Sequence, residues 1–273
     1  PTIGRELFPG VDVGQFAVRV RAPSGTRIEV SEKLIVRVEQ SIQKTIPKED
    51  LSMVISNIGV LLDWPAAYTP NSGPMDSFVL VQLTPDRTKS IQEYVVDLRE
   101  TLNGDYPGIE FAFETGGMMT AALNFGLTSP INIQIEGNKL EIAAKIAQSV
   151  QRICEAVPGT ADVRIQQKLD YPQLAVDVDR TRAAYAGLDQ VEVVKNVVTA
   201  FNSSINFNPS FWIDHKNGNH YFIGAQYPES DIVSMNTLEH IPITGKDQKS
   251  PVLLKNIAKF RRTTAPAEIN HLN

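Results

Sequence analysis

Few residues in this sequence have the types and spacing that metal binding requires. His215 and His220 flank Asn217 and Gly218, the strongest two-residue hairpin signal in the chain. A turn at those two residues would place the histidines opposite each other on one face of the hairpin. Two histidines are too few for a closed zinc site, so we expect a solvated or partner-facing pair.

Sulfur ligands are equally sparse. Met118 and Met119 are adjacent, so on a regular strand or helix their side chains point in different directions and cannot readily bind one ion. Cys154 is the single cysteine, which excludes an internal disulfide and a multi-cysteine metal site. We therefore predict no metal site and no cofactor.

The sequence also lacks the constellations that catalysis needs. It contains no nucleophile elbow, phosphate-binding loop or metal-binding His–Glu spacing. Asp177 and Asp179 share a strand face, but Arg180 and Arg182 follow them, which favours salt-bridged structural roles over acid–base chemistry. We predict that the chain is not an enzyme.

Composition limits the possible partners. The 273 residues are 42% hydrophobic and 21% charged, typical of a globular protein with one large domain or two to three small ones. The net charge is −5 and no Lys/Arg run exceeds two residues, so nucleic acid is not an expected partner. Apolar runs such as 58–62 are far shorter than the roughly 20 residues that cross a bilayer. Any signal or anchor is expected outside this sequence.

Local patterns predict the elements of a first unit. Residues 16–21 alternate apolar and polar, as in a half-buried strand. Thr26 and Glu29 have capping-box spacing, and apolar residues then recur at helical intervals until Pro47. Further strands are expected over 51–55, 78–83 and 109–113, with a helix over 91–102. The order β-α-β, loop, β-α-β predicts an α+β, ferredoxin-like fold with two helices on one face of the sheet.

A second unit is expected to start at Pro130. Ile131, Ile133 and Ile135 alternate with polar residues, as in a strand. A helix over 140–157 and a strand over 161–166 would complete one β-α-β half.

The matching half does not follow directly. The chain instead continues into an inserted, mixed α/β domain whose hairpin at Asn217 should protrude. Its other expected elements are a strand over 174–178 and helices over 180–186 and 190–201. The chain returns to the second unit through 257–269, which leaves that unit looking truncated.

Several separated motifs, in this order, resemble the C-terminal periplasmic loop of AcrB-like resistance-nodulation-division (RND) efflux transporters. They occupy residues 8–9, 12–16, 22–26, 129–133, 177–183 and 187–188. The resemblance implies a first porter subdomain over 1–128, an incomplete second porter subdomain over 129–170 and 257–273, and an inserted docking, or funnel, subdomain over 171–256.

The resemblance also implies a function. The chain would be the periplasmic part of a proton-driven inner-membrane homotrimer that works with a periplasmic adaptor and an outer-membrane channel. The departures from multidrug members described below favour export of small amphiphilic compounds. Two alternatives stay open: a heavy-metal-exporting branch of the family, and a non-transport periplasmic interaction protein built from tandem ferredoxin-like units.

Four candidate substrate-binding residues follow from the resemblance. Phe111 and Phe113 share one strand face and match aromatic residues that line a pocket between the porter subdomains; the alternative is that they are core. Arg164 and Gln166 match polar pocket positions, which could orient a ligand; the alternative is a solvated strand face.

Other positions depart from the multidrug pattern. Arg19 and Arg21 stand where multidrug members tend to carry soft apolar residues on the first strand, which favours amphiphilic or anionic ligands if these charges are uncompensated; the alternative is that they are exposed surface arginines. Leu61, Leu62 and Trp64 lie in a segment that matches the family's switch loop, which gates substrate passage; the alternative is that this apolar loop is buried under another element. The predicted hairpin corresponds to the arm that inserts into a neighbouring protomer in the family.

Overall fold

The structure is a computed structural model that describes residues 12–60, 71–116, 129, 131–246 and 248–269. The chain divides into two compact units, of which unit 1 comprises 1–172 and 264–273 and unit 2 comprises 173–263. Strand β10 (Ala258–Ala265), most of which lies in unit 2, pairs with β5 (Tyr171–Val178). The predicted limits of the inserted subdomain at 171 and 256 stay predictions. The predicted division of unit 1 near residue 128 stays a prediction.

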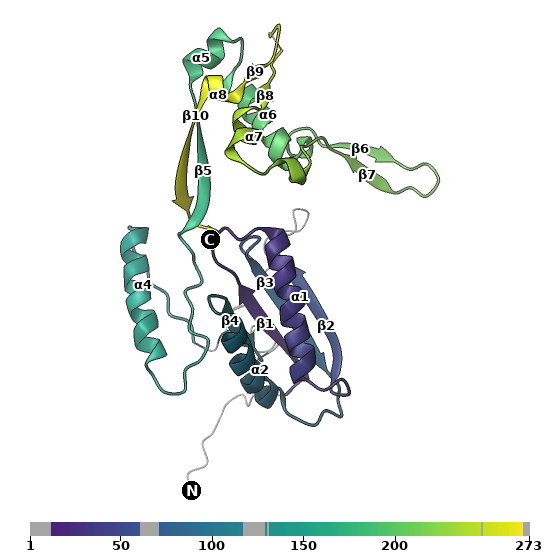
Figure 1. The fold of residues 1–273 in the computed structure, drawn as a ribbon, viewed down its shortest axis with the longest axis vertical. Helices are drawn as coiled ribbons and strands as arrows, with labels where there is room; N and C mark the ends of the chain where they lie inside the picture. Colours follow the sequence, from purple (N-terminus) through teal and green to yellow (C-terminus); the bar gives the residue numbers. More distant parts are fainter. Residues whose placement is uncertain (1–11, 61–70, 117–128, 130, 247, 270–273) are drawn as a thin grey trace. The chain divides into compact units, whose positions relative to one another are not determined.

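Unit 1 contains an antiparallel four-stranded sheet with two helices on one face (Figure 1). The strand order is β2-β3-β1-β4, which confirms the predicted ferredoxin-like arrangement. The strands are β1 (Gln15–Arg21), β2 (Leu51–Ile58), β3 (Asp76–Leu83) and β4 (Glu110–Glu114), and the helices are α1 (Ile28–Thr45) and α2 (Ile91–Asp105).

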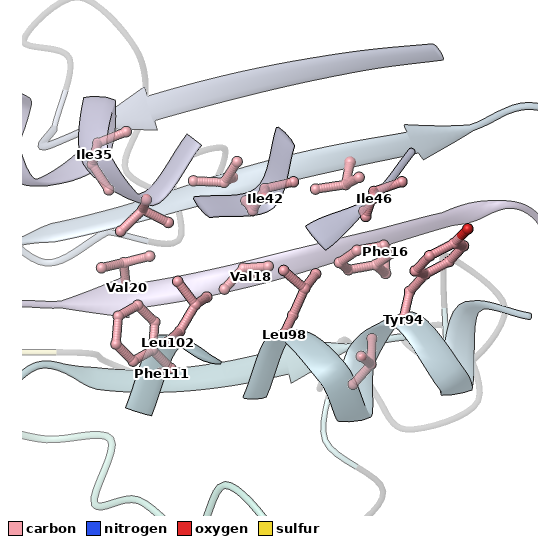
Figure 2. Close-up of a cluster of buried hydrophobic side chains, with 14 of the residues drawn as sticks. Phe16, Val18, Val20, Ile35, Ile42, Ile46, Tyr94, Leu98, Leu102 and Phe111 are labelled. Atoms are coloured by element: carbon pink, nitrogen blue, oxygen red, sulfur yellow. The ribbon is translucent and has the colours of Figure 1, made fainter. Parts of the chain in front are cut away.

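The alternation in β1 decides which side chains enter the core. Phe16, Val18 and Val20 are buried and face the helices, where Figure 2 shows them among side chains of α1 and α2. Because successive strand residues point to opposite faces, Arg19 and Arg21 lie on the face without helices. The core therefore fixes the position of both arginines.

The start of α1 differs from the prediction. Thr26 does not cap the helix, because its hydroxyl donates to the carbonyl oxygen of Pro23 at 2.7 Å; Arg27 occupies the N-cap position without a side-chain cap. The capping box of unit 1 lies instead at α2, where Ser90 and Glu93 each accept from the other's backbone N–H.

The segment that follows β4 in the described chain is less regular than predicted. The predicted helix is present as α4 (Leu140–Glu155), and none of its residues is buried. The predicted strands at 131–135 and 161–166 were wrong: neither segment pairs into a ladder within the described residues. Alternation alone cannot make a strand, since the backbone groups of a strand need a partner.

Unit 2 has its own small core, which includes Val193, Ile243 and Leu254. Asp189 and Glu192 form a capping box at the start of α6, and Asp179 accepts two backbone N–H groups at the start of α5. Besides β5 and β10, its elements are α5 (Arg180–Tyr185), α6 (Gln190–Asn202), η2 (Ser204–Asn206), β6 (Ser210–Ile213), β7 (His220–Ile223), η3 (Glu229–Asp231), α7 (Met235–Glu239), β8 (Pro242–Ile243), β9 (Val252–Leu253) and α8 (Leu254–Ile257). No helix in the described ranges has the length and apolar character needed to span a membrane.

The predicted hairpin is formed by β6 and β7, which extend away from the rest of unit 2 (Figure 1). Its turn is longer than predicted, because the N–H of Asp214 donates to the carbonyl oxygen of Asn219 and that of Gly218 to the carbonyl oxygen of Asp214. His220 therefore pairs with Ile213. The expectation that His215 and His220 oppose each other was wrong.

Candidate functional site

The open face of the sheet in unit 1 carries a cluster of charged side chains. Arg19 and Arg21 project from β1, and the register places Arg21 between Asp76 of β3 and Glu110 of β4. Cross-strand neighbours on one face lie close enough for opposite charges to pair. The strand register thus brings arginines and carboxylates together.

The chain after α4 runs beside β4 and closes one side of this cluster. The carboxylate of Asp162 accepts two hydrogen bonds from Arg99, at 2.7 and 2.8 Å, and one from the N–H of Phe113 at 2.9 Å. Farther along, Lys168 Nζ lies 2.5 Å from Glu110 Oε1. These side-chain contacts replace the ladder that was predicted at 161–166.

Glu114 is shared by two arginines. Arg19 donates to both of its carboxylate oxygens, at 2.7 and 3.3 Å. Arg164 contacts Oε1 of the same carboxylate at 3.5 Å. Burial, together with the positive charges of Arg19 and Arg21, lowers the pKa of Arg164 from its ordinary value, with Glu114 opposing this shift. Arg164 is therefore partly desolvated beside two other cations.

Arg21 makes a two-pronged pair with Asp76. Its Nε and a terminal nitrogen donate to the two oxygens of Asp76 at 2.5 and 3.1 Å, and its other terminal nitrogen donates to the carbonyl oxygen of Gln166 at 3.0 Å. Burial alone would raise the pKa of Asp76, but hydrogen bonds from Arg21 and Ser72 hold it below its ordinary value. Asp76 is therefore ionised at neutral pH.

A cavity of about 30 Å³ lies at this cluster. It is bordered by Arg19, Val20, Arg21, Asn71, Asp76, Ser77, Glu110, Phe111, Arg164 and Gln166. Five predicted substrate-binding residues, Arg19, Arg21, Phe111, Arg164 and Gln166, therefore meet at one place, although their role in binding a substrate stays a prediction.

The two predicted aromatic residues lie on the helix-covered face. Phe111 is 7% exposed, and its ring meets that of Tyr106 edge-on at 6.1 Å; Figure 2 shows Phe111 in the core beside Leu102. Phe113 is half-buried, with the guanidinium of Arg99 5.0 Å from its ring centre. Both rings therefore pack as core residues, which was the alternative interpretation. A direct contact with substrate stays a prediction.

Leu61, Leu62 and Trp64 lie outside the described residues. The described chain before and after this segment is linked by a hydrogen bond, which Asn71 Nδ2 donates to the carbonyl oxygen of Gly59 at 2.8 Å.

The structure corrects the charge argument for Arg19 and Arg21. Both guanidinium groups are paired with carboxylates, so the expectation of uncompensated positive charge at these two residues was wrong. Asp76 and Glu114 were missed because they lie far from the arginines in sequence. The sequence did show an acidic residue on each neighbouring strand. Only the strand register shows that these residues lie beside the arginines.

No group of three or more His, Cys, Asp and Glu side chains that could hold a metal ion occurs in the described part of the chain. Met118 and Met119 lie outside that part. In the hairpin, His215 and His220 do not oppose each other. The ring of His220 stacks on that of Phe211, with the ring centres 5.6 Å apart.

Comparison with known proteins places the chain among transporters. The model of the AcrB/AcrD/AcrF family matches residues 1–273. The chain is 22% identical to the cobalt-zinc-cadmium resistance protein CzcA of Cupriavidus metallidurans, over 99% of this chain and 25% of CzcA. It is 23% identical to protein HelA of Legionella pneumophila, over 99% of this chain and 26% of HelA.

Two further similarities concern metal transporters. The cation efflux system protein CusA of Escherichia coli K12 is 24% identical over 55% of this chain and 14% of CusA. A crystal structure of a heavy metal efflux pump superimposes with a TM-score of 0.78 at 22% identity, over 97% of this chain and 27% of the pump. The chain thus spans about a quarter of the length of the full-length relatives that it matches from end to end.

Proposed function

Because the chain belongs to the AcrB/AcrD/AcrF family of RND transporters, we propose that it forms the periplasmic porter and docking portion of an efflux pump. The observation that carries this proposal is the family match over the whole chain. The ferredoxin-like sheet of unit 1 and the long hairpin of unit 2 support it. The whole pump would contain a membrane domain, driven by proton flux, in another part of the protein.

The proposed substrate is a heavy-metal cation. CzcA and CusA are named as cobalt-zinc-cadmium resistance and cation efflux proteins, and the superimposed structure is a heavy metal efflux pump. This alternative has more support than the amphiphilic compounds that the sequence led us to expect. The pairing of Arg19 and Arg21 also removes the electrostatic reason for preferring anionic cargo.

The cavity offers a specific way to influence a passing cation. Asp76 and Glu110 border the cavity, and Glu114 pairs with two arginines that border it. Their carboxylate oxygens are a ligand type that divalent cations accept. Each carboxylate is held by an arginine or lysine, so a cation that bound there would have to displace its partner. We propose that this competition keeps the carboxylates from trapping the cargo.

Assembly and location form part of the same proposal. The pump would be a homotrimer in the inner membrane, joined to a periplasmic adaptor and an outer-membrane channel. The exposed aromatic residues of the hairpin would contact a neighbouring protomer. The chain would bind and pass its cargo without covalent chemistry, so we propose that it is not an enzyme.

The test is metal resistance. The intact transporter that contains this chain is expressed in a bacterium that lacks its own metal and drug efflux pumps. Growth is measured across series of Co²⁺, Zn²⁺, Cd²⁺, Ni²⁺, Cu⁺ and Ag⁺, and of anionic, neutral and cationic amphiphiles. We expect higher tolerance to at least one metal and no change for the amphiphiles.

Two variants sharpen the test. Arg19→Ala removes one partner of Glu114 and should alter metal tolerance, whereas Arg152→Ala on the exposed face of α4 should not, at equal expression. Tolerance to amphiphiles alone would contradict the metal assignment. Failure to export either class, with the trimer intact, would favour the non-transport interaction protein.

A further inference from the structure

One face of the hairpin formed by β6 and β7 carries three apolar side chains and one histidine. Phe211 pairs with Phe222 across the two strands, and Ile213 pairs with His220. Residues that are opposite each other, or two apart on one strand, share a face, so these four side chains lie together. All four are exposed. Within the described strands, His220 is the only ionisable side chain on this face.

His220 is in contact with an aromatic ring. Its imidazole stacks on the ring of Phe211, with the ring centres 5.6 Å apart and the planes at 4°. A cation over the face of an aromatic ring is attracted to it. Because water also reaches His220 in the exposed hairpin, the stack accommodates a protonated imidazole as well as a neutral one.

The charged groups of the hairpin near His220 lie in its turn. The carboxylate of Asp214 accepts the backbone N–H of Lys216 at 3.0 Å, and His215 is exposed. Strand β6 faces His220 with Phe211 and Ile213, neither of which titrates. Within the described residues no carboxylate forms an ion pair with His220. The hairpin therefore supplies no charge that would compensate a protonated imidazole out of water.

Assembly changes the free-energy cost of that proton. This step rests on the proposed function, in which the hairpin contacts a neighbouring copy of the chain. A surface that covers Phe211, Ile213 and Phe222 has to be apolar to match them, and it removes water from His220 as well. Covering a charged group without a partner is unfavourable, whereas a neutral imidazole costs much less.

We propose that His220 makes assembly of the trimer sensitive to pH. The hairpin docks on an apolar surface of the neighbouring copy with His220 neutral, and protonation of His220 favours the free hairpin. The free form thus binds a proton that the docked form excludes. By linkage, the trimer weakens as the pH falls through the range in which histidine ordinarily becomes charged.

The test follows the trimer of the intact transporter by native mass spectrometry from about pH 8 to about pH 5.5, the range in which histidine ordinarily gains its proton. We expect acidification to lower the trimer-to-monomer ratio of wild type several-fold. His220→Gln removes the proton-binding site and should flatten this response. His220→Lys fixes a positive charge and should lower the ratio at every pH.

His215→Gln is the matched control, because His215 lies in the turn and outside the apolar face. It should keep the wild-type response, with circular dichroism confirming that each variant is folded. The same pH response in wild type and His220→Gln would overturn the proposal while leaving the trimer itself in place. A wild-type trimer that strengthens in acid would also overturn it, since a carboxylate would then face His220. Absence of a trimer at every pH would overturn the proposed assembly and this inference together.

Discussion

Arg99 of α2 and Asp162 form a two-pronged ion pair, with nitrogen–oxygen distances of 2.7 and 2.8 Å. The same carboxylate accepts the backbone N–H of Phe113, so one side chain joins α2, β4 and the chain that follows α4. Asp162 has φ of 57°, in the left-handed region that residues other than glycine seldom adopt. The hydrogen bonds that Arg99 donates to Asp162 raise the pKa of Arg99. This contact fixes the segment that carries Arg164.

The first prediction concerns that pair. Asp162→Asn tolerates the same backbone conformation but removes the charge, and should reduce the free energy of unfolding by about 1–3 kcal/mol. Asp177→Asn is the control: its 3.8 Å pair with Arg261 is well exposed, so its loss should cost less than about 0.5 kcal/mol. Urea unfolding measures both. Equal losses would show that the Asp162 pair has no special role.

A second prediction concerns pH. Asp50 accepts hydrogen bonds from the Thr88 hydroxyl at 2.5 Å, from the Thr88 N–H at 2.8 Å and from the Tyr94 hydroxyl. These hydrogen bonds lower the pKa of Asp50, and the bond from the Thr88 side chain has the largest effect. A lowered folded-state pKa stabilises the protein above the unfolded value of about 3.9. This stabilisation is lost as the pH falls through the folded-state pKa.

Asp50→Asn should therefore unfold at a lower urea concentration than wild type at neutral pH, with a smaller difference in acid. Urea midpoints from neutral pH down to about pH 3 would measure this. Glu32→Gln, at an exposed position in α1, serves as the carboxylate control and should leave the acid profile of the wild type largely intact. A difference between Asp50→Asn and wild type that does not vary with pH would contradict the prediction.

A third prediction compares two buried serines of α1. Among the described residues, Ser31 Oγ has no hydrogen-bond partner, whereas Ser41 Oγ lies 3.0 Å from the Tyr106 hydroxyl. Ser31→Ala removes an unsatisfied group and improves helix propensity, so it should stabilise unit 1 by up to about 1 kcal/mol. Ser41→Ala should destabilise it by a similar amount. Thermal unfolding of the two variants gives the signs, and destabilisation by Ser31→Ala would contradict the analysis.

The last prediction concerns the hairpin. Trp212 and Tyr221 are paired across β6 and β7, their rings 5.9 Å apart and both half exposed. A two-stranded arm has little core of its own, so such rings gain more from a partner surface than from each other. Trp212→Ser with Tyr221→Ser, or deletion of 214–220, should weaken the trimer of the intact transporter in native mass spectrometry. Lys216→Ala at the turn is the control, and an unchanged trimer in both variants would contradict the proposed role.

The sequence by itself determined the four-stranded sheet of unit 1 and its two covering helices, because apolar periodicity in β1, α1 and α2 reports which face is buried. The motifs also identified the family, which the match over the whole chain bears out. The turn of the hairpin and the strand at 161–166 were mispredicted, since hydrogen-bond partners decide both.

Only the tertiary structure decided the electrostatics of the cavity. Arg21 and Asp76 are 55 residues apart in the sequence, and Arg19 and Glu114 are 95 apart. Nothing local indicates that either arginine has a partner, because a cross-strand neighbour is set by the register of the whole sheet. Arg164 reaches Glu114 from the segment that follows α4, which forms no ladder among the described residues, so the sequence does not reveal this contact either.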